Sequence, residues 1–225
     1  MLIAPAPGSF RSDLPFRYVG GDASLDLVNT VDWASSTLER DRLAGYADLV
    51  RWAEGARVLL PDDALALRTV AEAHPQQADA ALEMSRRLRW LFKRLFSSLI
   101  TGHVDEYALD EFNEVLADSL RHLRVAVGGG RAAQGRRASW SWRCLRERLE
   151  SPLWPVVWSA AILLTSSDAA RVRVCGGPDC GWLFVDRSRN GLRRWCEMAT
   201  CGTAAKSRRR AERGRTREPS AGGAA

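Results

Sequence analysis

The sequence predicts a mainly α-helical protein with a small β-hairpin, an α+β chain in which a helical N-terminal domain precedes a small cysteine-rich finger. Apolar residues recur at three-and-four spacing through most of the first part, the period of amphipathic helices. One short stretch changes to the alternating period of strands, and four of the five cysteines follow residue 171. We therefore divide the chain into residues 1–170, 171–213 and 214–225, the last a disordered tail by its composition.

The first predicted helix lies within GGDASLDLVNTVDWASS, residues 20–36. Its apolar positions fit one face of a short helix: Leu25, Leu27 or Val28, and Val31. The opposite face offers four polar side chains, Asp26, Asn29, Thr30 and Asp32. This polar face either lines a ligand-sensing pocket or serves capping and packing, and short polar side chains more often bind nearby backbone.

Two amphipathic helices are predicted at residues 46–59 and 61–74. The first places four apolar side chains on one stripe, Tyr46, Leu49, Val50 and Ala53. The second begins with a proline and acidic residues, which helix N-termini favour.

The clearest helix runs over residues 76–100 and stops at Gly102. Its apolar stripe is Leu88, Leu91, Phe92, Leu95 and Leu99. The other face is basic, with Arg86, Arg87, Arg89, Lys93 and Arg94. We interpret that face as the solvated exterior of a long helix and assign it no function. A further helix is predicted at residues 109–120, after an acidic start.

The period then changes to that of strands. HLRVAV, residues 122–127, and ASWSW, residues 138–142, both alternate apolar and polar residues, and a Gly-rich turn begins at residue 128. This pattern predicts a β-hairpin with a long loop. Ser151 and Pro152 suit the N-cap and first position of an apolar helix that ends near Ser166.

No segment has the features of a membrane span or an export signal. The longest apolar run, LWPVVWSAAILLT, has 13 residues with a proline inside, whereas a bilayer span needs about 20. The N-terminus, MLIAPAPGSFRSDLPF, lacks a basic segment followed by an unbroken apolar one. We expect a cytoplasmic protein with no membrane partner.

Four cysteines form two pairs, Cys175 with Cys180 in CGGPDC and Cys196 with Cys201 in CEMATC, and fifteen residues separate the pairs. Zinc prefers tetrahedral thiolate ligands, and two short chelating loops on one chain can wrap a single ion. The alternative is two disulfides or four independent buried thiols. A reducing cytosol disfavours the disulfides. Four thiolates leave no position for a catalytic water, so we expect a structural Zn²⁺. Cys144 stays unpaired and is expected to pack as a small core residue.

The segment around the second cysteine pair predicts the rest of the finger. WLFV, residues 182–185, suits a short strand. A turn follows at Asp186, Ser188, Asn190 and Gly191. The composition of residues 204–213 suits a basic helix.

The positive charge of the chain is concentrated at its C-terminal end. Residues 1–170 hold 20 basic and 22 acidic side chains, whereas residues 171–225 hold 13 basic and 5 acidic. Such asymmetry is typical of contact with a polyanion, although a basic tail can also be merely solvated. Eight candidate phosphate contacts would give binding a log-log salt slope of roughly −7. They are Arg187, Arg189, Arg193, Arg194, Lys206, Arg208, Arg209 and Arg210.

The stretch CGGPDCGWLFVDRSRNGLRRWCEMATCG resembles the CGNR zinc finger, a bacterial module found at the C-terminus of proteins regarded as transcription regulators. SLDLVNTVDW and YADLVRWAEGARVL resemble the ABATE domain that precedes this finger. The resemblance implies a mainly helical N-terminal domain, zinc ligands at the four paired cysteines and contact with DNA. One departure is visible, since Thr203 and Ala204 stand where the family has Asn and Arg.

Our leading hypothesis is a zinc-binding transcription regulator whose finger contacts DNA, while the helical domain forms a homodimer or senses a small-molecule effector. RNA is the alternative nucleic acid, because Trp182 and Trp195 could stack on bases, although both are better suited to the core of so small a module. A second hypothesis is a zinc-stabilised protein-interaction or small-molecule-sensing module without direct DNA contact.

An enzyme is the third function class that we considered. The three histidines, His74, His103 and His122, are far apart, and no HExxH pairing, phosphate loop or serine elbow is present. We expect no catalytic residues.

Overall fold

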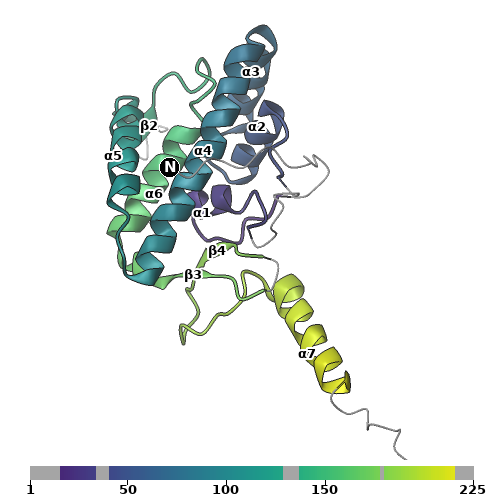
Figure 1. The fold of residues 1–225 in the computed structure, drawn as a ribbon. Helices are drawn as coiled ribbons and strands as arrows, with labels where there is room; N and C mark the ends of the chain where they lie inside the picture. Colours follow the sequence, from purple (N-terminus) through teal and green to yellow (C-terminus); the bar gives the residue numbers. More distant parts are fainter. Residues whose placement is uncertain (1–15, 34–40, 129–136, 178–179, 216–225) are drawn as a thin grey trace, which may run out of the picture.

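The computed structural model describes residues 16–33, 41–128, 137–177 and 180–215 (Figure 1). These residues form seven α-helices and two antiparallel two-stranded sheets, which confirms the predicted helical chain with small hairpins. Of the predicted disordered tail at residues 214–225, residues 216–225 lie outside the described residues, as does the predicted loop at residues 129–136. Residues 214 and 215 are helical instead, as the end of the last helix (Thr203–Arg215). None of the helices in the described ranges has the length and hydropathy of a transmembrane span.

Six helices build the N-terminal part, and they follow the predicted segments closely. They are α1 (Ala23–Val28), α2 (Tyr46–Gly55), α3 (Pro61–Ala73), α4 (Pro75–Thr101), α5 (Glu106–Leu120) and α6 (Leu153–Thr165). The long helix α4 crosses this part and contacts α1, α2, α3, α5 and α6 (Figure 1). It ends where predicted, at Gly102, which has the left-handed backbone conformation (φ 76°) that glycine adopts without strain.

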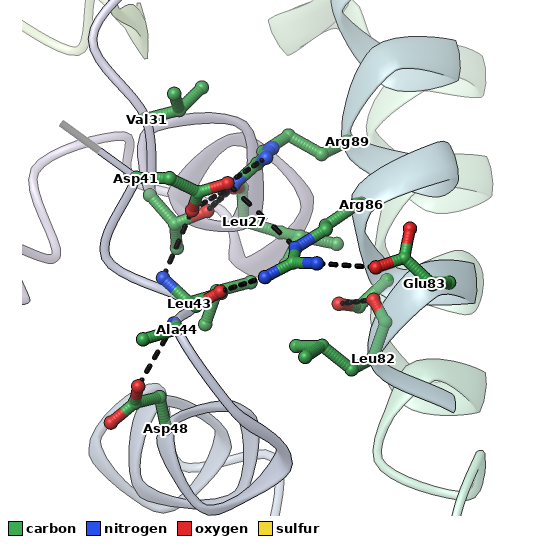
Figure 2. Close-up of polar contacts among 12 residues, drawn as sticks. Leu27, Val31, Asp41, Leu43, Ala44, Asp48, Leu82, Glu83, Arg86 and Arg89 are labelled. Atoms are coloured by element: carbon green, nitrogen blue, oxygen red, sulfur yellow. Dashed lines mark hydrogen bonds and ion pairs between the residues drawn. The ribbon is translucent and has the colours of Figure 1, made fainter. Parts of the chain in front are cut away.

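The basic face of α4 is not a solvated exterior, so that prediction is wrong for three of its five side chains. Arg89 is 3% exposed, and its guanidinium donates to both carboxylate oxygens of Asp41 at 2.8 and 2.6 Å (Figure 2). Arg86 donates to a backbone carbonyl of the same loop, and Lys93 donates to the carbonyl of Gly181 in the finger at 2.7 Å. The loop at residues 41–43 and the finger both pack on this face, which helical periodicity cannot reveal.

The predicted hairpin is confirmed as β1 (Leu123–Gly128) paired with β2 (Arg137–Trp142), with Val125 opposite Trp140. Two local predictions beside it are wrong. Cys144 is exposed rather than in the core, and it lies just after β2 in the left-handed backbone conformation (φ 57°). Ser151 is not an N-cap, since its hydroxyl donates to the carbonyl of Leu145 at 2.7 Å and α6 begins two residues later.

The C-terminal part contains β3 (Val172–Val174), which pairs with β4 (Leu183–Val185), a π-helical turn (Met198–Gly202) and α7 (Thr203–Arg215). The sequence predicted β4 and α7 but not β3. Figure 1 shows α7 projecting away from the rest of the molecule. Strands β3 and β4 instead pack against the helical part, because the side chains of Val172, Leu183 and Val185 belong to the same buried cluster as those of the helices.

Candidate metal centre and nucleic-acid surface

Four cysteine sulfurs converge beside the β3–β4 hairpin. The Sγ atoms of Cys175, Cys180, Cys196 and Cys201 all lie within 4.8 Å of one another. Two of the separations are 3.7 Å (Cys180 to Cys196) and 3.6 Å (Cys196 to Cys201). A tetrahedron of sulfurs about 2.3 Å from zinc has edges of about 3.8 Å, whereas a disulfide bond is about 2.0 Å long. The four free thiols therefore fit a tetrathiolate zinc site and not a pair of disulfides.

The backbone around the cysteines supports this donor set. Cys175 Sγ accepts hydrogen bonds from the N–H groups of Cys196 (3.2 Å) and Gly177 (3.4 Å), which favour a thiolate at this position. A side chain at Gly177 would bring its Cβ to 3.1 Å from the sulfur of Cys201. Glycine at this position therefore lets the first cysteine loop close over the site.

The finger is held against the helical part by the residue after α1. The Asn29 amide donates to the Leu183 carbonyl at 2.8 Å, and the Leu183 N–H donates back to the Asn29 side-chain oxygen at 2.9 Å. The Trp182 indole N–H donates to the carbonyl of Val31 at 2.9 Å, and the Val185 N–H donates to the carbonyl of Gly20 at 2.8 Å. These bonds satisfy backbone groups at the free edge of β4, which would otherwise be buried without partners.

Lys93 adds a charge to this contact. Its ammonium bonds the Gly181 carbonyl and lies 5.4 Å from the centre of the Trp33 ring. Burial lowers the pKa of Lys93 to about 8, and the nearby Cys180 sulfur acts in the opposite direction. A zinc ion with four thiolates carries a net charge of about −2, so a cation here offsets part of it.

The predicted polar face is dispersed among protein partners. Besides Asn29, the Asp26 carboxylate accepts from the Gly20 N–H at 2.8 Å, and the Thr30 hydroxyl accepts from Arg89 at 3.0 Å. Asp32 pairs with Arg42 at 3.0 Å. None of these four polar residues lines either of the two cavities described below. A sensing role for this face stays a prediction, and the contacts observed here are structural.

Asp26 makes the stability of this region depend on pH. Burial raises the pKa of Asp26 to about 7, although the hydrogen bond from the Gly20 N–H acts to lower it. A carboxyl whose pKa is raised by folding stabilises the protein fully below its unfolded pKa and loses that contribution as pH rises toward 7. We expect the free energy of unfolding to fall by up to about 4 kcal/mol between pH 4 and 7 from this group.

Asp26→Asn keeps an oxygen that accepts from the Gly20 N–H but cannot ionise. It should remove the fall in the free energy of unfolding between pH 4 and 7, and it should be more stable than the wild type at pH 7.5. Urea unfolding of both proteins at several pH values measures it. The exposed Asp79→Asn serves as the control and should unfold like the wild type. Parallel pH curves for Asp26→Asn and the wild type would contradict the expectation.

Two of the eight predicted phosphate contacts are committed to the fold. Arg187 pairs with Asp168 at 2.9 Å and donates to the carbonyl of Gly21 at 2.7 Å. Arg193 lies over the Phe184 ring, 4.3 Å from its centre, and its guanidinium bonds three backbone carbonyls. Like Arg187, the other six are exposed, and they are Arg189, Arg194, Lys206, Arg208, Arg209 and Arg210.

The six exposed cations lie on the outer turn of the finger and on α7. The helical period places Lys206, Arg209 and Arg210 on one side of α7. Arg194 lies over the Trp195 ring, 5.6 Å from its centre, beside a shallow cavity of about 220 Å³ under the first turns of α7. Trp182 is buried against the helical domain and is therefore not available for base stacking.

The two residues that depart from the family pattern, Thr203 and Ala204, lie at the start of α7, directly after the π-helical turn. The Thr203 hydroxyl donates to the carbonyl of Met198 at 3.2 Å, which closes the turn that carries Cys201 into α7. Ala204 is exposed on the first turn of the helix. The threonine thus braces this junction, whereas alanine offers no group that could bind phosphate.

Two family models match the chain. The CGNR zinc finger matches residues 171–214, and the ABATE model, described as a putative stress-induced transcription regulator, matches residues 21–167. No curated protein matches it. Neither family is one of enzymes. Together, the CGNR match and the four converging sulfurs assign a structural zinc ion to Cys175, Cys180, Cys196 and Cys201.

Proposed function

Because the chain belongs to the ABATE family and ends in a CGNR zinc finger, we propose that it is a transcription regulator that binds DNA through helix α7 and the neighbouring turn of the finger. Zinc is the structural element in this proposal. It fixes Cys201 two residues before α7 begins, and the hydrogen bonds of β4 fix the finger on the helical domain.

The observation that carries the proposal is the position of α7. Its 13 residues form a helix about 20 Å long, which leaves the body of the protein instead of packing on it (Figure 1). Four of the six exposed cations are on this helix. An α-helix fits the major groove of B-DNA, and lysine and arginine side chains then reach the flanking phosphates.

The salt dependence of DNA binding tests this proposal. Six phosphate contacts predict a log-log slope of roughly −5, shallower than the roughly −7 expected for eight. We would measure it by fluorescence anisotropy of the zinc-loaded chain with a mixed-sequence duplex, between 50 and 300 mM salt. No binding at the lowest salt, or a slope near zero, would reject DNA contact in favour of a protein-interaction finger.

A further inference from the structure

The helical domain contains a cavity that shares no lining residue with the finger. It has a volume of about 520 Å³ and lies where α4, α5 and α6 meet, beside the start of β1. Figure 1 shows these three helices side by side. A cavity of about 150 Å³ suffices to hold benzene, and ligand sites commonly range from about 300 to 1,000 Å³. The space is therefore large enough for a molecule of two fused rings.

The wall of the cavity is mostly apolar and partly aromatic. Leu88, Val115, Leu153 and Val157 contribute aliphatic surface from all three helices. The Trp154 ring carries the His122 ring stacked upon it, with centroids 3.8 Å apart and planes 3° from parallel. Flat aromatic walls favour flat aromatic ligands, which bury a large apolar area against them.

One hydroxyl of the wall is open to the cavity and makes no bond to the residues that the structure describes. Ser119 is 4% exposed and lines the cavity, and its hydroxyl makes no hydrogen bond within the described part of the chain. A ligand atom that accepts or donates a hydrogen bond can pair with this hydroxyl in exchange for its bond to water, for a net gain of about 0.5–1.5 kcal/mol.

The charges at the cavity are already matched. Arg148 pairs with Glu150 at 2.6 Å, and Arg121 pairs with Asp118 at 3.1 Å. Burial, followed by the neighbouring Arg148, lowers the pKa of His122, which disfavours a charged ring. The site thus offers no uncompensated charge to an ionic ligand, while the imidazole can exchange a hydrogen bond with a neutral one.

We propose that this cavity is a binding site for an uncharged, planar aromatic molecule of about two fused rings that carries one hydroxyl or carbonyl group. The rings lie against the stacked His122–Trp154 pair and the aliphatic side chains, and the polar group bonds the Ser119 hydroxyl. This site does not depend on DNA binding by the finger.

Titration calorimetry of the full zinc-loaded chain with 2-naphthol as the probe tests the site. We expect saturable binding of one molecule per chain, and naphthalene-2-sulfonate, of similar shape but charged, should bind at least about tenfold more weakly. Ser119→Ala, which removes only the hydroxyl, should weaken 2-naphthol binding by about threefold to tenfold. Absence of saturable binding, or equal affinity for the sulfonate, would overturn the proposal.

Two filling variants locate the binding. Ser119→Leu should abolish it, because the larger side chain enters the cavity. Met84→Trp should also abolish it from the rim, where a side chain that is 46% exposed tolerates enlargement without loss of folding. Ser207→Leu, on exposed α7, is the matched control and should bind like the wild type. Unchanged binding in a folded Met84→Trp protein would place the probe elsewhere and reject the site.

Discussion

Replacement of Cys196 by serine is expected to release the zinc ion and to destabilise the helical domain together with the finger. Cys196 is 2% exposed, and its sulfur is within 3.7 Å of two other ligand sulfurs. Structural zinc contributes roughly 10–16 kcal/mol of apparent binding free energy in isolated fingers, and three thiolates do not retain that affinity. The finger should therefore lose its fold.

The helical domain should be affected because it shares its core with the finger. Undocking exposes Val172, Leu183 and Val185, whose burial stabilises the fold by about 2 kcal/mol each. At about 2–4 °C per kcal/mol for a chain of this size, we expect Tm to fall by at least about 10 °C. Elemental analysis for zinc and calorimetric unfolding of the full chain measure the two effects.

Two matched variants define what the loss means. Cys144→Ser, at the exposed cysteine, should keep one zinc per chain and the wild-type Tm. Asn29→Ala removes both side-chain bonds to Leu183 without touching a ligand, so it should keep the zinc but lower Tm. If Cys196→Ser lost its zinc and unfolded at the wild-type temperature, the shared core would not couple the two parts.

The helices could be predicted from the sequence because each buries one apolar stripe, and a stripe is visible as a period of three and four. The four ligands could be predicted because two short cysteine loops specify one ion without reference to the rest of the fold. In both cases the information is local. The helix at residues 76–100 and the cysteine pairs needed no knowledge of what packs beside them.

What could not be predicted are contacts between segments far apart in the chain. Asn29 and Leu183 are 154 residues apart, and nothing near either one shows that they bind each other. Arg89 and Lys93 look like solvent-facing cations until the loop and the finger that cover them are placed. The same holds for Arg193, whose guanidinium closes the finger from within although its position in a basic segment suggests phosphate.

Loss of the exposed cations on α7 is expected to weaken DNA binding strongly. Simultaneous replacement of Lys206, Arg209 and Arg210 by alanine removes one side of α7, and alanine, the best helix former, preserves the helix. Each lost phosphate contact should reduce the salt slope by about 0.9, so three contacts in place of six should change the slope from roughly −5 to about −3. Affinity for duplex DNA at 100 mM salt should fall on the order of 100-fold, equally for all sequences.

A second triple variant separates position from net charge. Replacement of Arg87, Arg121 and Arg124 by alanine removes the same three charges from exposed sites on the helical domain. If α7 is the contact surface, this protein should keep the wild-type slope and nearly the wild-type affinity, because only cations adjacent to phosphates release counterions. Equal losses in the two triple variants would mean that DNA responds to total charge alone, and α7 would then have no special role.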